Sequence, residues 1–171
     1  SALSCSILYA QTNLISYGNN WKYLDNGTNQ GTAWRATSFN DASWASGNAQ
    51  LGYGDGDEAT VVSYGPNASQ KYITTYFRKT ITVVNASLYT GFTLNIKRDD
   101  GAVVYINGTE RFRTNMPAGN ISFTTRASTD ATDDGNTPQT TSLSTGVLTE
   151  GTNVIAVEIH QRVRTSTDIS F

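Results

Sequence analysis

The sequence predicts an all-β domain, an antiparallel two-sheet jelly-roll β-sandwich with almost no helix. Apolar and polar residues alternate along 72–83, 92–97 and 153–161, which is the period of strands that bury one face. Turn residues divide the chain into about ten short strand-like segments, a pattern typical of sandwiches and barrels. The abundance of Thr, Ser, Asn and Gly agrees with this fold class, because these residues are weak helix formers.

The strand signals before residue 72 are short. Strands are expected at 14–17 and 21–24, the second of them followed by an Asp-Asn-Gly turn. Residues 28–48 are expected to be mostly loop, with one helical turn in 39–44.

The clearest strand is the long run 72–84. Phe77, Ile81 and Val83 fall on one face of it and should point into the core. Lys79 interrupts this apolar face and predicts a bulge or a strand end.

A hairpin is expected between strands at 102–106 and 110–113. Asn107-Gly108 joins them, and Asn-Gly is the strongest two-residue hairpin signal. The preceding segment 92–97 should direct its even-numbered apolar side chains inward. These are Phe92, Leu94 and Ile96.

The last part of the chain combines one long strand with polar connections. Strands are expected at 121–123, 153–161 and 168–171, whereas the polar stretch 128–141 is expected to be a mobile loop. The long strand should face the core with alternate residues, Ile155, Val157 and Ile159.

Composition and charge exclude several classes of partner. The 171 residues fit one domain, and the net charge of −2 with a pI of about 5.2 comes without a basic patch. We therefore expect no nucleic-acid partner. No apolar run after residue 11 is long enough to span a bilayer, so no membrane insertion is expected. We expect a monomer.

The N-terminal segment 1–11 has two readings. It is small, apolar and uncharged, like the tail of a secretory signal peptide cleaved after Ala10, or it forms a first strand at 6–10. Cys5 is the only cysteine, so no internal disulfide can form. The segment predicts a secreted or cell-surface protein, with 12–171 as a single domain that belongs to a larger protein.

Four motifs together carry a resemblance to a known family. They are WKYLDNG at 21–27, LGYGDGDE at 51–58, RDDGAVVYING at 98–108 and NVIAVEIHQ at 153–161. With them, most of residues 13–171 resembles the galactose-binding-like jelly-roll domains of secreted bacterial proteins, as in β-galactosidase-type enzymes and carbohydrate-binding modules. The resemblance implies a sugar-binding or accessory role and, in some members, a structural calcium ion.

The densest acidic cluster predicts a cation site. Asp55, Asp57 and Glu58 lie on a loop in which Gly54 and Gly56 allow a tight turn. Calcium prefers six to eight oxygen ligands, which such carboxylates and nearby carbonyls can supply. The alternative is a solvated turn in which the acidic side chains bond to the backbone.

A second candidate site is a polar face built from the two longest strands. Tyr76 and Arg78 share the non-core face of one strand, and Glu158 and His160 share that of the other. If the strands are neighbours, these four residues form a glycan-binding patch with Trp34 as the stacking aromatic. The alternative is an internal ion pair between Arg78 and Glu158 with His160 beside it.

Catalytic patterns are scarce. One histidine and one cysteine exclude ordinary zinc sites, and there is no G-x-S-x-G nucleophile elbow and no phosphate-binding loop. Asp57 with Glu158 is the conceivable pair for glycoside hydrolysis. We therefore predict a non-catalytic accessory module, in a secreted bacterial protein, that binds carbohydrate or docks a neighbouring catalytic domain. The alternatives are a purely structural β-sandwich without a ligand and a weak glycoside-active enzyme.

Overall fold

The computed structural model describes residues 11–171. The two readings of the N-terminal segment, as a signal remnant or as a first strand at 6–10, fall outside the described residues. Among the described residues, no helix is long and apolar enough to cross a membrane.

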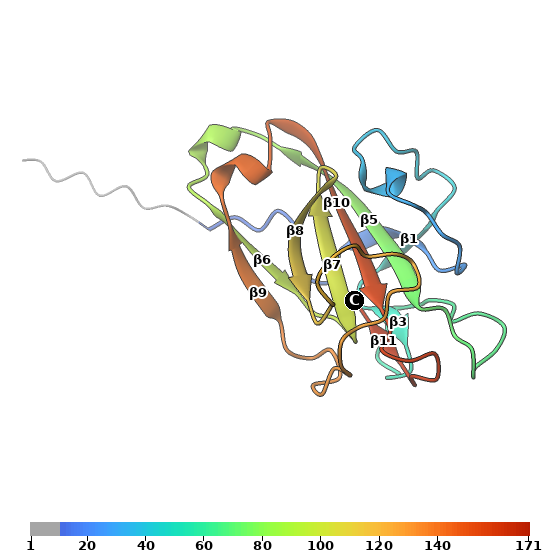
Figure 1. Cartoon of the computed structure of the whole chain (residues 1–171). Helices are drawn as coiled ribbons and strands as arrows, with labels where there is room; N and C mark the ends of the chain where they lie inside the picture. The colour runs from blue at the N-terminus through green and yellow to red at the C-terminus, as the bar shows by residue number, and fades with distance from the viewer. Residues whose placement is uncertain (1–10) are drawn as a thin grey trace, which may run out of the picture.

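A six-stranded antiparallel sheet forms the first layer of the molecule, with the strand order β2-β1-β5-β10-β7-β8 (Figure 1). Its strands are β1 (Asn20–Leu24), β2 (Ala45–Asn48), β5 (Thr74–Val83), β7 (Gly101–Ile106), β8 (Thr109–Thr114) and β10 (Gly151–His160).

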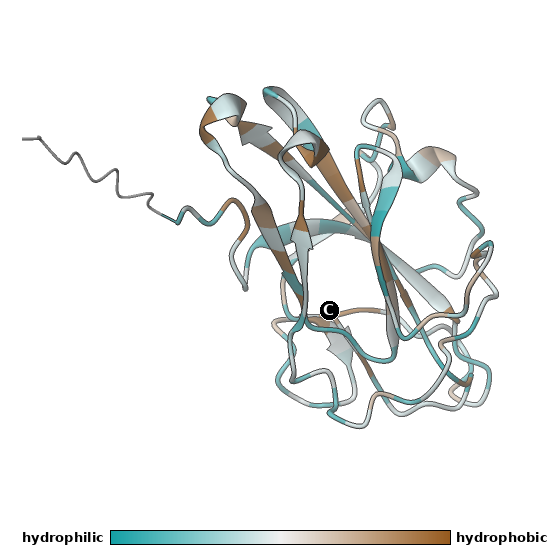
Figure 2. Cartoon of the chain, turned by 60° about the vertical axis from the view of Figure 1, so that its left-hand side comes forward, coloured by the Kyte–Doolittle hydropathy of each residue, from teal (hydrophilic) through white to brown (hydrophobic). Residues whose placement is uncertain are grey.

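The second layer consists of two smaller sheets. One has the order β11-β3-β4, and the other is the antiparallel pair β6–β9. Only the short β3–β4 pair is parallel among the described ladders. The remaining strands are β3 (Leu51–Tyr53), β4 (Thr60–Val61), β6 (Phe92–Ile96), β9 (Gln139–Leu143) and β11 (Ile169–Ser170). Apolar segments of both layers face the interior (Figure 2), which confirms the predicted all-β, antiparallel sandwich.

Short 3₁₀ turns are the only helical elements of the described residues. They are η1 (Ala33–Arg35), η2 (Ala86–Leu88) and η3 (Thr145–Val147).

The central pair β5–β10 is the longest ladder, with ten residues of each strand in register. Phe77, Ile81 and Val83 are buried on its inner face, as predicted. The bulge or strand end predicted at Lys79 is wrong, because the ladder passes through it without a register shift, opposite Ile155. The flexible Lys79 side chain reaches the rim of the sheet, where its Nζ donates to the carbonyl of Asn20 at 2.8 Å.

The Asn-Gly hairpin is confirmed between β7 and β8. Asn107 and Gly108 have φ values of 51° and 83°, the left-handed backbone that a two-residue hairpin turn requires. The Asn107 side chain also ties the hairpin to β10. Its Oδ1 accepts from the backbone N–H of Val154 at 2.9 Å, and its Nδ2 donates to Asn153 Oδ1 at 2.7 Å.

Two predicted strands are absent. The segments 14–17 and 121–123 form no strand, although their apolar residues pack against the core as irregular chain. In 39–44 there is a turn closed by Trp44 N–H to the carbonyl of Asp41 at 3.0 Å, but no helix. A run of two or three apolar residues indicates that the segment is buried, but it does not determine whether the backbone forms a strand.

Two regions predicted to be loop contain regular structure. Residues 28–48 hold η1 and β2, and the polar stretch 128–141 ends in the first residues of β9. β9 has little apolar alternation, and it is held by its ladder with β6 and by a side-chain bond from Thr140 Oγ1 to Asn95 Oδ1 at 2.7 Å.

The six-stranded sheet buries both of its faces. The inner face joins the aliphatic core between the layers. The outer face carries a second cluster that the segment 25–44 covers, and its buried members are Trp34, Trp44, Tyr76, Val103, Tyr105 and Ala156.

Candidate functional site

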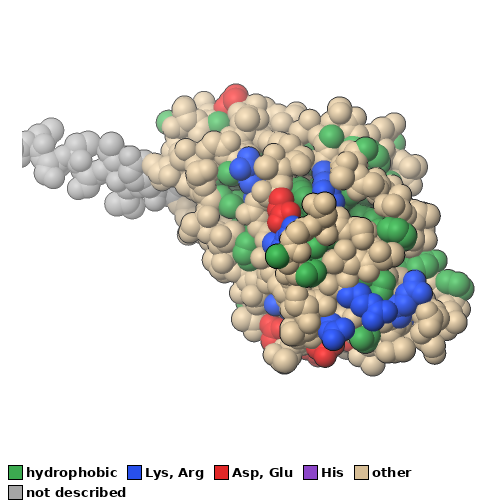
Figure 3. Space-filling model, in the orientation of Figure 1, with side chains coloured by type: hydrophobic (Ala, Val, Ile, Leu, Met, Phe, Trp, Pro, Cys, Tyr) green, Lys and Arg blue, Asp and Glu red, His purple; other side chains and the backbone are tan. Residues whose placement is uncertain are grey.

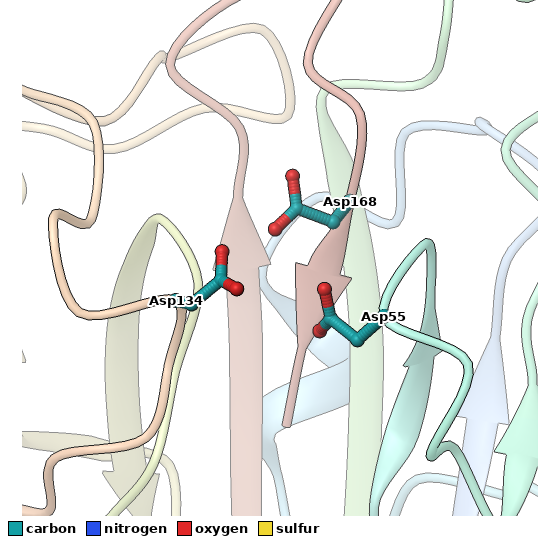
Figure 4. A group of neighbouring side chains, drawn as sticks. All are labelled: Asp55, Asp134 and Asp168. Atoms are coloured by element: carbon teal, nitrogen blue, oxygen red, sulfur yellow. The ribbon is translucent and has the colours of Figure 1, made fainter.

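Three carboxylates from distant parts of the chain meet at one end of the sandwich (Figure 4). Asp55 follows β3, Asp134 lies in the loop before β9, and Asp168 immediately precedes β11. One oxygen from each residue lies within 4.8 Å of the other two. The side chains point toward one another from three separate segments, so a single ion could contact all three.

The backbone makes this approach possible at Gly54. Its φ is 111°, and a Cβ atom there would lie 2.7 Å from both the Asp168 Cβ and the Thr167 carbonyl oxygen. Glycine is therefore required for the loop that carries Asp55 to pass so close to Asp168.

The electrostatics of the three-aspartate cluster (Asp55, Asp134 and Asp168) are unfavourable without a cation. Partial burial, followed by repulsion from Asp168 and Asp134, raises the pKa of Asp55 to about 6. The charge of Asp168 likewise raises the pKa of Asp134. A divalent cation would remove this repulsion, so the donor set suits calcium, which binds carboxylate oxygens.

Asp99 and Asp100 lie beside this cluster and have different environments. Burial, then the charges of Asp100 and Asp168, raise the pKa of Asp99 to about 8. Asp100 instead has backbone partners, since its two oxygens accept from the N–H groups of Ala131 at 2.8 Å and Arg162 at 2.7 Å. Asp100 thus holds two connecting loops in place.

Of the sequence-predicted metal ligands, only Asp55 belongs to the three-aspartate cluster. Glu58 turns back on its own loop, where its two oxygens accept from the N–H groups of Asp55 at 2.9 Å and Gly56 at 3.0 Å. Asp57 is exposed, and its charge contributes to the raised pKa of Asp55. A metal-binding role for Asp57 and Glu58 stays a prediction. Asp134 and Asp168 were missed, because no sequence signal brings three distant loops together.

The residues of the second candidate site lie on the outer face of the six-stranded sheet. β5 and β10 are neighbours, with Tyr76 opposite Glu158, and Trp34 packs edge-on against Tyr76 at a centroid distance of 4.9 Å. His160 Nδ1 lies 2.7 Å from the Thr125 carbonyl oxygen and 3.0 Å from the Thr74 hydroxyl.

The alternative of an ion pair between Arg78 and Glu158 is not realised, because each has another partner. Arg78 Nε donates to Asp41 at 2.8 Å, and its NH1 donates to the carbonyl of Trp34, so this side chain fastens the covering segment to the sheet.

Glu158 lies in a separate network. It accepts from the Tyr105 hydroxyl at 2.7 Å and pairs with Arg35 at 3.3 Å, and one of its oxygens is 3.4 Å from His160 Nε2. The burial of Tyr105, with the nearby charge of Glu158, raises the pKa of that phenol. Tyr105 and Arg35 thus contact the same carboxylate oxygen, Oε1.

Burial decides what this patch can contact. The exposed fractions are 0% for Trp34, 2% for Tyr76, 1% for Arg78, 2% for Glu158 and 0% for His160. The segment 25–44 and the loop 116–125 both pack against this face, so the role of these residues in carbohydrate binding stays a prediction. On the face drawn in Figure 3, charged and hydrophobic side chains are sparse, and most of the visible surface is neither.

Comparisons with known proteins identify the fold. No protein-family model matches the sequence, and no curated protein matches it. A β-glucuronidase from glycoside hydrolase family 2 superposes with a TM-score of 0.55 and 20% identity, over 84% of this chain and 13% of that chain. A β-glucuronidase of an uncultured Clostridium sp. gives a TM-score of 0.55 and 15% identity, over 90% of this chain and 24% of that one. The shared feature is a β-sandwich that forms a small part of much longer chains.

A third similar structure comes from Bacteroides uniformis. It is a calcium-binding mutant of Bacteroides uniformis β-glucuronidase 2, which matches with a TM-score of 0.53 and 18% identity over 85% of this chain and 14% of that chain. Calcium binding is thus a studied property of one protein that contains this fold.

Proposed function

We propose that the chain is a non-catalytic accessory module of a secreted, glycan-active bacterial protein, and that it docks against a neighbouring catalytic domain. One observation carries the proposal: the same sandwich makes up between 13% and 24% of the β-glucuronidase chains that it resembles. The resemblance of four sequence motifs to galactose-binding-like domains supports the same role.

The buried polar network supports a non-catalytic role. Glu158, half of the conceivable pair for glycoside hydrolysis, is 2% exposed and held by Tyr105 and Arg35. A general acid or nucleophile must reach its substrate, and this carboxylate lies under a fastened cover. A second candidate function, carbohydrate binding by the module itself, rests on Trp34, Tyr76, Arg78, Glu158 and His160 and requires that cover to open.

The isolated chain distinguishes these roles. We expect no turnover of nitrophenyl glycosides and no signal on a glycan array, which together leave domain docking and the purely structural sandwich without a ligand. Glycan binding that Trp34→Ala weakens at least tenfold, with the fold retained by circular dichroism, would support the carbohydrate-binding role instead. Turnover that Asp57→Asn or Glu158→Gln abolishes would contradict the proposal and establish an enzyme.

Calcium is part of the same proposal, with Asp55, Asp134 and Asp168 as its ligands. The donors are hard carboxylate oxygens within 4.8 Å of one another, and their mutual repulsion has no cation to offset it among the described side chains. A bound ion would join the loops that follow β3 and precede β9 and β11. These loops lie at one end of the sandwich, where they would present a fixed surface to a neighbouring domain.

Thermal unfolding tests the calcium site directly. Calcium at a hundredfold excess over its Kd should raise the unfolding midpoint by about 5–10 °C, because only the folded chain brings the three aspartates together. Asp168→Asn should remove this shift, whereas Asp130→Asn, at an exposed position near the same end, should retain it. Loss of the shift in Asp57→Asn would assign the site to the single loop 55–58 instead. Equal midpoints in calcium and in chelator would exclude a calcium role.

A further inference from the structure

A cavity of about 1000 Å³, partly open to solvent, lies between the two layers. Its walls come from both layers and combine polar residues with an apolar part. The apolar part includes Ile81, Leu94, Ile96, Val104, Ile155 and Phe171. Protein interiors are close-packed, and even an engineered apolar cavity of about 150 Å³ takes up apolar ligands. A partly apolar space of this size therefore indicates a binding site for another group.

One wall of this cavity is an unfinished sheet edge. β6 pairs with β9 along one edge, and along the other it has no partner strand among residues 11–171. All five residues of β6 line the cavity. Unpaired N–H and C=O groups at such an edge are satisfied best by another strand, which a lipid or an apolar small molecule cannot provide.

The first step of that pairing is present. Ser170 forms an antiparallel bridge with Asp99, just after β6, through Asp99 N–H to the Ser170 carbonyl at 3.0 Å and Ser170 N–H to the Asp99 carbonyl at 3.4 Å. The next residue, Phe171, points inward and packs against Trp21 and Phe77 at centroid distances of 4.9 and 4.3 Å. A strand that enters beside Phe171 and runs antiparallel to β6 would continue this ladder across the cavity.

We propose that the cavity is the docking site of an extended peptide strand that pairs antiparallel with the free edge of β6. The burial pattern along β6 determines which positions of the docked strand must be apolar. Leu94 is half-buried and Ile96 is buried. Thr93 and Asn95 also contribute to the cavity wall, but they are exposed. Residues opposite each other in a ladder point to the same face, so the strand must carry apolar residues at alternate positions.

A covalent extension tests the proposal at high effective concentration. Eight residues that alternate Thr and Val, beginning with Thr after Phe171, place every Val inward. The matched control begins with Val and has the same composition, but it places every Val outward. We expect the first extension to slow hydrogen exchange of the β6 amides at least tenfold and to reduce the binding of an apolar fluorescent dye. Equal exchange with both extensions would overturn the proposal.

Substitutions in β6 and β9 test whether the protection of the β6 amides depends on the cavity. Leu94→Asp places a charge in the cavity and should abolish the protection, whereas Ser142→Asp, at an exposed position of the neighbouring strand β9 outside the cavity wall, should retain it. Amides of β5 and β10 report in the same experiment that each variant is folded, and Leu94→Ser replaces Leu94→Asp if that variant unfolds. Dye or fatty acid that binds the chain and is not displaced by the first extension would overturn the proposal in favour of an apolar ligand. A dimer of the unextended chain with protected β6 amides would overturn it in favour of a second copy.

Discussion

The two faces of the six-stranded sheet are both buried, but by different means. The inner face is apolar and lies over a cavity of about 1000 Å³, whereas the outer face carries aromatic and charged side chains under a loop. On the inner face, packing depends on the second layer and leaves room for a further strand. On the outer face, directional bonds from Arg78 to Asp41 and to the carbonyl of Trp34 hold the cover in one position.

This difference shows that polar side chains along one face of a strand do not indicate that the face is exposed to solvent. Tyr76, Arg78 and Glu158 give the outer face the composition of a binding surface, yet each is at most 2% exposed. Buried charges are tolerated there because each has a partner, and a paired charge fixes a loop more specifically than an apolar contact does.

The largest effect is expected on the inner face. Phe77→Ala should destabilise the protein by about 3–5 kcal/mol, because a fully buried ring that packs against Phe171 is replaced by a void. Urea denaturation measures this loss. A loss below about 1 kcal/mol would contradict the difference between the two faces, since it would mean that the inner face is not the principal core.

A smaller and more local effect is expected on the outer face. Arg78→Met keeps the side-chain length but leaves Asp41 and the Trp34 carbonyl without their donor, at a loss of about 2–3 kcal/mol. Near-ultraviolet dichroism of the tryptophans should change with it, because Trp34 belongs to the released segment and is buried against the sheet. Arg164→Met, at an exposed position, is the control and should stay within about 0.5 kcal/mol. Equal losses in both variants would contradict the fastening role of Arg78.

The smallest effect is expected for the hydrogen bond between Tyr105 and Glu158 on the outer face. Tyr105→Phe removes the hydroxyl that donates to Glu158 at 2.7 Å and should destabilise by about 1–2 kcal/mol, since Arg35 still faces the carboxylate. Tyr89→Phe is the matched control on the half-buried side of the other layer, where a near-neutral result is expected. If the two phenylalanine variants have the same stability, the buried hydroxyl bond contributes nothing.

The alternation of apolar and polar residues predicted the strands that bury one face in the core. The strands β5, β6 and β10 and the Asn107-Gly108 hairpin follow from local pattern and turn chemistry alone. β9 could not be predicted in this way, because its polar side chains give no alternation and its ladder with β6 is a tertiary interaction.

The candidate site was predictable only where strand parity determines it. Parity placed Arg78 and Glu158 on the same face of adjacent strands, but it does not reveal that residues 25–44 cover that face. Asp55 was singled out by its acidic loop, whereas Asp134 and Asp168 meet it through loop positions that depend on the assembled sheets. Such long-range convergence has no local sequence signal.

The β5–β10 ladder has a consequence for synthesis on the ribosome. Its two strands, Thr74–Val83 and Gly151–His160, form the centre of the six-stranded sheet although a long stretch of chain separates them. The apolar face of β5 therefore emerges from the exit tunnel well before its partner is translated. Until β10 emerges, β5 can pair only with β1, and its other edge stays unpaired. Chaperones bind nascent chains in this state, and nascent chains that are not bound can associate wrongly. Slower translation between these two strands would lengthen that interval and lower the yield of folded protein.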